Sequence, residues 1–474
     1  MIEKIAQKID QKWDEEIQKA IEDFVRIPAL SIAFDQNWEK NGWLDQAVDY
    51  AQSWAQGLDI PGIKLQKIKL KGASPCLFAE IPGTGKKAND KTVFFYGHLD
   101  KQPPSLGWDE NKSAWNPVVE NGCLYGRGSA DDGYAWFCSL SAIKALDAEG
   151  IDRPRCVALF ETAEESGSQN YEQYLEMIQK KLGDIGLVVV LDSSCGDYDR
   201  LWITQSLRGM VSGELKVKVL KHGVHSGEAG GYVPSSFMII RQLLDRIEDS
   251  KTGKILGNSF QVSVPKEVQE ETQKNSHILG CYIDQSYPWN ASTKRMIDKM
   301  DEVILNRAWG SSLSVVGCDG IPDVESAGNV LRPYTTLKLS LRLPPTADAK
   351  LAAKSLSDTL TANAPFGAEV SFDKVGFGSG FYAERKSDWL ADAIRESSEK
   401  LWNNPPVYFG IGASIPLLSM FQKIWPQASF VVAGVLGPKS NAHGPNECLN
   451  IAYAKKLTTS VAHIVACMPV DADQ

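Results

Sequence analysis

Five short segments, far apart in the chain, each place a histidine or a carboxylate shortly after an apolar run. They are residues 97–100, 126–133, 163–168, 191–194 and 441–445. Imidazole and carboxylate ligands without thiolates suit zinc, manganese or cobalt in an open catalytic site, and a set of this size can hold two metal ions. The chain is therefore predicted to be a metallohydrolase.

Two metal ions need one carboxylate that bridges them, and Asp131 is the strongest candidate. Gly126, Gly128 and Gly133 surround Asp131 with flexible backbone, and a helical pattern over 134–146 follows it. An aspartate that only caps this helix is the competing interpretation. Capping alone does not explain the coincidence with the other four segments.

His98 follows a buried apolar run at 92–96. A lone histidine in such a place is more often structural than a ligand. Asp100, two residues further on, can hydrogen-bond the second ring nitrogen and so select the tautomer. We therefore favour His98 as a metal ligand that Asp100 orients.

Glu164 and Glu165 follow a second apolar run, at 156–160. Two neighbouring glutamates usually form a solvated acidic turn. In a metal site, a cation would offset their repulsion. The natural division then places Glu165 on the metal and leaves Glu164 free to act as the general base.

The elements that position these residues follow from the pattern of apolar runs. Residues 1–205 and 386–474 carry almost entirely apolar runs between helical stretches, namely 92–96, 156–160, 187–191 and 429–435. Such runs predict an α/β domain with a mainly parallel sheet flanked by helices. Reactive groups in these sheets lie just beyond the carboxyl ends of the strands, so the motifs should converge on one edge.

Residues 206–385 show a different pattern. Alternating strands are predicted at 214–219 and 336–342, with helices near 234–248 and 347–362. This region is predicted to be a smaller, inserted α+β domain with one exposed sheet face. A polar stretch at 265–276 is expected to form a mobile excursion within it.

Composition and charge argue against several classes of protein. The net charge of -9 over 474 residues disfavours a nucleic-acid or anionic-membrane partner. No segment approaches the roughly 18 apolar residues of a membrane span, and the first residues form an acidic amphipathic stretch, so a cytoplasmic location is expected. The nine scattered cysteines never form Cys-x-x-Cys and suggest neither a disulfide framework nor a thiolate zinc site.

The five segments, in this order and spacing, resemble the co-catalytic zinc metallopeptidases. This family includes carnosinase-like cytosolic dipeptidases, aminoacylase-type deacylases, carboxypeptidase G and succinyl-diaminopimelate desuccinylase. The resemblance covers nearly the whole chain. Residues 206–209, 225–231 and 412–416 most resemble the carnosinase-like dipeptidase branch, although Ala413 stands where a second glycine is usual.

The resemblance implies a ligand set for two divalent metal ions, with zinc as the first choice and manganese or cobalt as alternatives. One ion would be bound by His98, Asp131 and Asp192, and the other by Asp131, Glu165 and His443.

The resemblance also implies roles around the metals. Glu164 would be the general base toward the metal-activated water, and Asp100 would orient His98. The peptide bond between Asp131 and Asp132 would be the family's non-proline cis bond.

Further residues are implied in the inserted domain, which would act as a lid and form a homodimer. His225 would reach the partner's active site and stabilise the oxyanion, whereas a histidine of a surface loop is the alternative. Arg342 would clamp a substrate carboxylate, with Gly412 and Ser414 in the same pocket, whereas a solvent-facing arginine is the alternative.

The predicted reaction is hydrolysis of the amide bond of dipeptides or small peptides with a free C-terminal carboxylate. Asp192 favours dipeptides, because many carboxypeptidase and desuccinylase relatives carry Glu at the position that it resembles. A deacylase of N-acyl or N-succinyl amino acids is the nearest alternative. A metal-free binding protein is a distant one, since it would predict a damaged ligand or a missing base.

Overall fold

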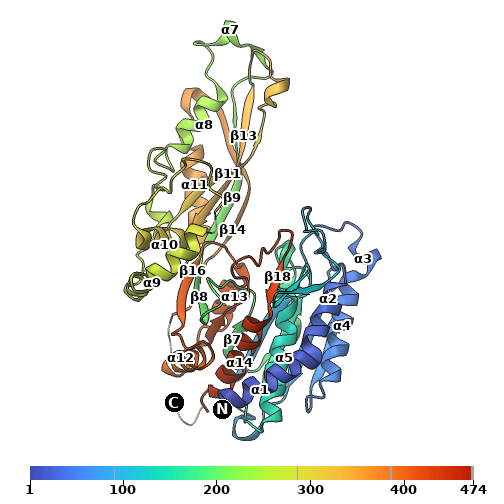
Figure 1. Cartoon of the computed structure of the whole chain (residues 1–474). Helices are drawn as coiled ribbons and strands as arrows, with labels where there is room; N and C mark the ends of the chain where they lie inside the picture. The colour runs from blue at the N-terminus through green and yellow to red at the C-terminus, as the bar shows by residue number, and fades with distance from the viewer. Residues whose placement is uncertain (90, 286, 385–386, 471–474) are drawn as a thin grey trace. The chain divides into compact units, whose positions relative to one another are not determined.

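The computed structural model describes residues 1–89, 91–285, 287–384 and 387–470. The chain divides into two compact units (Figure 1). The first comprises Met1–Thr204, Ala383–Tyr408 and Trp425–Gln474, and the second Gln205–Tyr382 and Phe409–Ile424.

The predicted division assigned 206–385 to the inserted domain and 386–474 to the first. The second unit also contains 409–424, because this segment is bonded to its backbone: the Arg208 amide donates to the Ala413 carbonyl at 3.0 Å. The predicted boundary at 385/386 falls outside the described residues.

The main sheet of the first unit has the strand order β1-β2-β6-β3-β7-β17. Its parallel strands are β6 (Cys156–Glu161), β3 (Thr92–His98), β7 (Ile185–Val190) and β17 (Ser429–Val432). Strands β1 (Lys64–Ile68) and β2 (Cys76–Ile81) extend it antiparallel beside β6. The four apolar runs are these four parallel strands, so the predicted α/β fold with a mainly parallel sheet is confirmed.

Helices account for most of the rest of the first unit. They are α1 (Ile2–Lys12), α2 (Gln18–Val25), α3 (Trp38–Asn41), α4 (Trp43–Gly57), α5 (Gly133–Ala148), α6 (Tyr171–Leu182), α12 (Asp388–Trp402) and α14 (Ile451–Cys467). Helix α5 is buried on nearly all sides because it packs between β3 and the helices α1 and α14. Its N-terminus is therefore held firmly at the edge of the sheet.

A small antiparallel sheet, in the order β18-β5-β4, completes this unit. Its strands are β4 (Val118–Glu120), β5 (Cys123–Tyr125) and β18 (Cys448–Asn450). The pairing of β5 with β18 places the glycine-rich segment after β5 next to the residues before β18. Two of the five motifs are joined in this way.

The second unit is built on a sheet with the order β11-β13-β9-β14. Its strands are β9 (Gly209–Lys218), β11 (Ser312–Asp319), β13 (Tyr334–Leu343) and β14 (Glu369–Gly378). Alternate residues of β9 and β13 are buried and pack against α8 (Ser236–Leu244) and α11 (Ala349–Thr361). This is the predicted α+β arrangement with one open sheet face.

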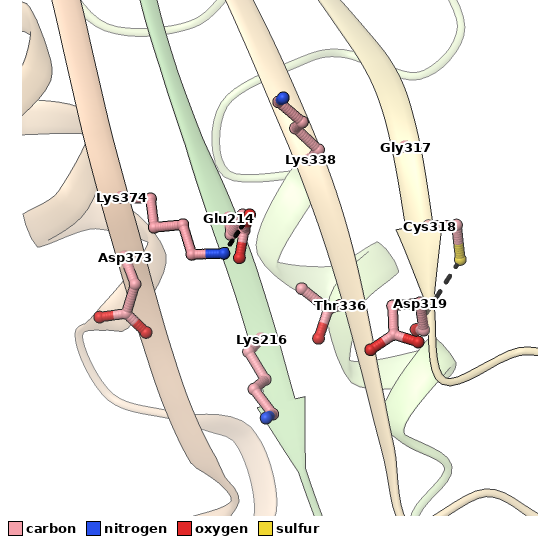
Figure 2. Close-up of a pocket in the computed structure, with 9 residues that line it drawn as sticks. All are labelled: Glu214, Lys216, Gly317, Cys318, Asp319, Thr336, Lys338, Asp373 and Lys374. Carbon is pink, nitrogen blue, oxygen red and sulfur yellow. Dashed lines mark hydrogen bonds and ion pairs between the residues drawn. The ribbon is translucent and has the colours of Figure 1, made fainter. Parts of the chain in front are cut away.

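The open face of this sheet is polar and slightly hollowed, with a cavity of about 470 Å³. Figure 2 shows Lys374 of β14 reaching Glu214 of β9, and their ion pair measures 2.9 Å. Lys216 and Lys338 stand on the same face.

The expectation of a mobile excursion at 265–276 is wrong. The stretch begins helix α9 (Lys266–Gln285). Its buried side chains recur every three or four residues, at Val268, Thr272, Asn275, Leu279 and Ile283. This spacing forms one buried helix face even though two of its five members, Thr272 and Asn275, are polar.

Other elements of the unit are α7 (Ser226–Ala229), α10 (Met300–Trp309), α13 (Pro416–Ile424), β10 (Val224–His225), β12 (Val330–Leu331) and β15 (Phe381–Tyr382). Two of the four crossings of the chain between the units fall within strands, namely β8 (Trp202–Leu207) and β16 (Val407–Ile411). None of the described helices combines the length and apolar character that crossing a bilayer requires.

Candidate functional site

Three neighbouring parallel strands of the first unit deliver polar side chains to one edge of the sheet. His98 is the last residue of β3. Glu164 and Glu165 form a short 3-10 turn after β6, and Asp192 lies two residues beyond β7. The convergence expected for the carboxyl ends of parallel strands is therefore present.

Asp131 lies between two histidines. Its Oδ1 is 3.4 Å from Nε2 of His98, and its Oδ2 is 3.0 Å from Nε2 of His443. The N-cap of helix α5 is Asp132, so Asp131 is not the helix cap. The bond between Asp131 and Asp132 is cis, as predicted.

Each histidine also faces a second carboxylate. Nε2 of His98 is 3.9 Å from Oδ2 of Asp192, and Nε2 of His443 is 3.4 Å from Oε2 of Glu165. Glu164 belongs to the same cluster, because one of its oxygens lies within 4.8 Å of ligand atoms of His98 and Asp192. The structure thus brings together all five predicted ligands and the predicted base.

Asp100 contacts both His98 and the glutamate turn. Nδ1 of His98 lies 3.1 Å from the Asp100 backbone carbonyl and 3.4 Å from its Oδ1. The two Asp100 carboxylate oxygens also accept hydrogen bonds from the amides of Glu164 and Glu165, at 3.2 and 3.1 Å. Asp100 therefore contacts the imidazole of His98 and the backbone of both glutamates.

Sequence reasoning missed Gln102. Its Nε2 donates a hydrogen bond to Oε2 of Glu165 at 2.6 Å. Its only sequence signal is its place two residues after Asp100, in the loop that follows β3.

Arg127 and Glu447 were missed as well. Nη1 of Arg127 donates to Oε2 of Glu447 at 2.6 Å, and both side chains are buried. The other oxygen of Glu447 accepts from the amides of Gly128, Ala130 and Asp131 at 3.0, 3.2 and 3.1 Å. Each residue stands inside or beside a motif, but their pairing joins positions 320 residues apart.

The electrostatics of the cluster show an excess of negative charge. Burial and the charge of Asp131 raise the pKa of Glu165 to about 8. Burial raises the pKa of Asp192 to about 6, and burial with the charge of Asp192 holds the pKa of Glu164 well above its usual range. A cation at the cluster would stabilise all three carboxylates.

The donor atoms fit divalent metal ions. Among the described residues, the buried Nε2 of His98 and Oε1 of Glu165 have no hydrogen-bond partner. Unsatisfied buried atoms of this kind are costly unless a ligand engages them. Two imidazoles and carboxylates suit zinc, manganese or cobalt, and the two oxygens of Asp131 suit a bridge between two ions.

The remaining predicted residues belong to the second unit. Arg342 is half-buried and donates from Nη1 to Oγ of Ser414 at 2.8 Å. A Cβ at Gly412 would stand 3.0 Å from Nη2 of Arg208. His225 is exposed, and its Nδ1 accepts hydrogen bonds from two backbone amides, at 3.1 and 3.3 Å.

Comparison with known proteins finds a matching family model and similar dipeptidases. The family model described as Peptidase family M20/M25/M40 matches residues 94–466. The chain is 26% identical to the Cys-Gly metallodipeptidase DUG1 of Saccharomyces cerevisiae over 401 residues, which cover 80% of each protein. It is 25% identical to the Beta-Ala-His dipeptidase of Homo sapiens over 467 residues, covering 95% of this chain and 89% of that one.

Solved structures share the fold. The crystal structure of human carnosine dipeptidase 1 superposes with a TM-score of 0.75 at 23% identity and covers 98% of both chains. The M20 family metallo-carboxypeptidase Sso-CP2 from Sulfolobus solfataricus gives a TM-score of 0.76 at 22% identity, covering 95% of this chain and 99% of that one.

Proposed function

Since the chain belongs to peptidase family M20/M25/M40, we propose that it is a two-metal dipeptidase that hydrolyses the amide bond next to a free C-terminal carboxylate. One observation supports this proposal most directly: the two carboxylate oxygens of Asp131 face two different histidines. The relatives described above, a Cys-Gly metallodipeptidase and a Beta-Ala-His dipeptidase, support dipeptides as the substrate class.

The metal ligands that we propose form two sets that share one residue. His98, Asp131 and Asp192 would hold one ion, and Asp131, Glu165 and His443 the other. Zinc is the ion that we favour. Bound metal supplies Lewis acidity, which polarises the scissile carbonyl and acidifies the attacking water.

Glu164 is the residue that we assign to proton transfer. A carboxylate oxygen of Glu164 takes a proton from the attacking water and delivers it to the nitrogen of the leaving amino acid. Its side chain has no hydrogen-bond partner in the described part of the chain, and Asp100 holds its backbone amide at 3.2 Å. A residue whose backbone is fixed and whose side-chain carboxylate has no partner within the described residues suits proton transfer.

We assign substrate contacts to the second unit, which would act as a lid and as the dimerisation domain. Arg342 and Ser414 would bind the C-terminal carboxylate. His225 would stabilise the oxyanion of the partner subunit's reaction. Because Nδ1 of His225 accepts from backbone N–H groups, a neutral ring carries its proton on Nε2, where it is a donor.

The test is amide hydrolysis by the metal-reconstituted protein. Free dipeptides are compared with N-acetyl amino acids and N-succinyl-diaminopimelate at equal concentration. Rapid cleavage of dipeptides supports the proposal. Cleavage of acylated amino acids alone would make the protein a deacylase and overturn the choice of substrate.

A further inference from the structure

Three arginines of the second unit lie near one another, and none of them has an acidic partner among the described residues. Oγ of Ser414 accepts from Nη1 of Arg342 at 2.8 Å and donates to the Arg208 carbonyl, and a Cβ at Gly412 would lie 3.0 Å from Nη2 of Arg208 and 3.3 Å from the Arg307 carbonyl. Arg208 follows β8, Arg307 belongs to the last turn of α10, and Arg342 is near the end of β13. Nη1 of Arg208 donates to Oγ of Ser312 at 3.0 Å. The guanidinium of Arg307 stands 5.6 Å from the centre of the Tyr282 ring.

The three charges influence one another. Burial, and after it the positive charges of Arg342 and Arg307, lower the pKa of Arg208 to about 10. Burial lowers the pKa of Arg342 as well. Like charges that are held together in a partly buried place lower the stability of the fold. Such clusters occur mainly at sites that bind or react with charged ligands.

Three buried or partly buried arginines elsewhere in the chain are paired with carboxylates. Ion pairs join Arg127 to Glu447, Arg153 to Asp147 and Arg200 to Asp197, at 2.6, 2.8 and 2.9 Å. On the open face of the same sheet, Lys374 is paired with Glu214 (Figure 2). The three arginines of the second unit differ from Arg246, which lacks a carboxylate as well but donates to three backbone carbonyls. They lie together without an acidic partner among the described residues, and a bound anion would supply one.

Bonds within the protein leave donors of the trio available. Arg208 uses Nε on the Gly412 carbonyl at 3.1 Å, and Nη1 on Ser312 and on the Gly310 carbonyl at 3.3 Å, but its Nη2 has no hydrogen-bond partner among the described residues. A side chain at position 412 would press on that nitrogen, because its Cβ would lie 3.0 Å away. Glycine at this position keeps the guanidinium accessible.

We propose that Arg208, Arg307 and Arg342 form a subsite for dipeptides whose C-terminal residue is Asp or Glu. This inference rests on the proposed function, in which Arg342 and Ser414 bind the C-terminal carboxylate. One carboxylate neutralises one of three positive charges. A second carboxylate on the same amino acid brings the site closer to neutrality, and the planar guanidinium groups of Arg208 and Arg307 suit its two oxygens.

The test compares kcat/KM for Ala-Glu and its neutral isostere Ala-Gln. The wild-type protein should prefer Ala-Glu by at least about tenfold, the effect of one charge-assisted hydrogen bond. Arg307→Gln should bring this ratio close to one, and Arg307→Lys, which keeps the charge, should restore part of it. Arg241→Gln, which removes an exposed arginine of helix α8, is the matched control and should leave the ratio unchanged.

A binding measurement makes the result independent of turnover. L-glutamate and L-glutamine are compared, at equal ionic strength, for the rise in melting temperature that they produce in the full-length protein. Glutamate should stabilise the wild type more than glutamine does, and Arg307→Gln should abolish the difference.

The outcomes separate the two proposals. Failure to cleave any dipeptide would overturn the proposed function, while the melting experiment would still decide on the arginine subsite. Equal use of Ala-Glu and Ala-Gln, equal stabilisation by the two amino acids, or an Arg307→Gln variant that keeps the preference would overturn the subsite.

Discussion

The carboxylate of Glu447 holds the backbone of Asp131, because its Oε1 accepts the Asp131 amide hydrogen bond at 3.1 Å. The other oxygen is engaged by Arg127 at 2.6 Å, and Arg127 also donates to the Gly444 carbonyl at 2.8 Å. One buried ion pair thus links the loop that carries Asp131 to the loop that carries His443. The separation between these two candidate ligands depends on it.

Replacing Glu447 by glutamine should damage both stability and activity. Arg127 is only 1% exposed, and without an anionic partner its buried charge should lower the free energy of unfolding by about 3 kcal/mol. Metal affinity should fall about tenfold or more, because a residue that positions the ligands is lost. Urea unfolding of the metal-free protein and zinc titration measure the two effects.

A double variant provides the control for this prediction. Combining Glu447→Gln with Arg127→Met removes both charges and should recover part of the lost stability. If Glu447→Gln unfolds and binds metal like the wild type, the ion pair does not position the site.

The apolar runs made the strands before the ligands predictable, because a strand buried on both faces needs an apolar sequence. Most of the ligands then followed from their positions at or just beyond the ends of these strands, as His98, the last residue of β3, illustrates. Asp131 followed instead from the glycines around it and the helix after it. The Arg127–Glu447 pair was not predictable in the same way, because it depends on the packing of β5 against β18. Helix α9 was missed because Thr272 and Asn275, both polar, occupy part of its buried face.

Glu164→Gln should abolish turnover while the protein still binds metal. The substitution removes the proton acceptor and keeps the size of the side chain, so kcat should fall about 100-fold or more. Elemental analysis and circular dichroism should match the wild type. A variant that retains most of its activity would require a different general base.

Removal of metal should inactivate the enzyme reversibly and lower its melting temperature. After a chelator has removed the metal and has itself been dialysed away, addition of zinc or manganese should restore hydrolysis, with about two ions bound per chain. Asp131→Asn should weaken both ions together, since we assign this residue to both. Loss of only one ion in Asp131→Asn would contradict the bridging role.

Arg342→Met should selectively impair substrates with a free C-terminal carboxylate. Loss of a bidentate charged contact should raise KM for a dipeptide about tenfold or more. The advantage of the dipeptide over its C-terminal amide should therefore shrink in the variant. If the variant still prefers the dipeptide over its C-terminal amide as strongly as the wild type does, another residue binds the carboxylate.

The assignment of His225 to the partner subunit can be tested by complementation. His225→Ala and Glu164→Gln should each be inactive alone, because each lacks one group that the reaction needs. If His225 acts across a dimer, a mixed dimer contains one complete site, formed by Glu164 of one subunit and His225 of the other. Co-expression of the two variants in equal amounts should then recover about a quarter of the wild-type activity. Recovery measured on the purified mixed dimer supports action across subunits, whereas no recovery would place His225 in its own subunit's site. A His225→Ala variant that is active alone would place His225 outside the reaction.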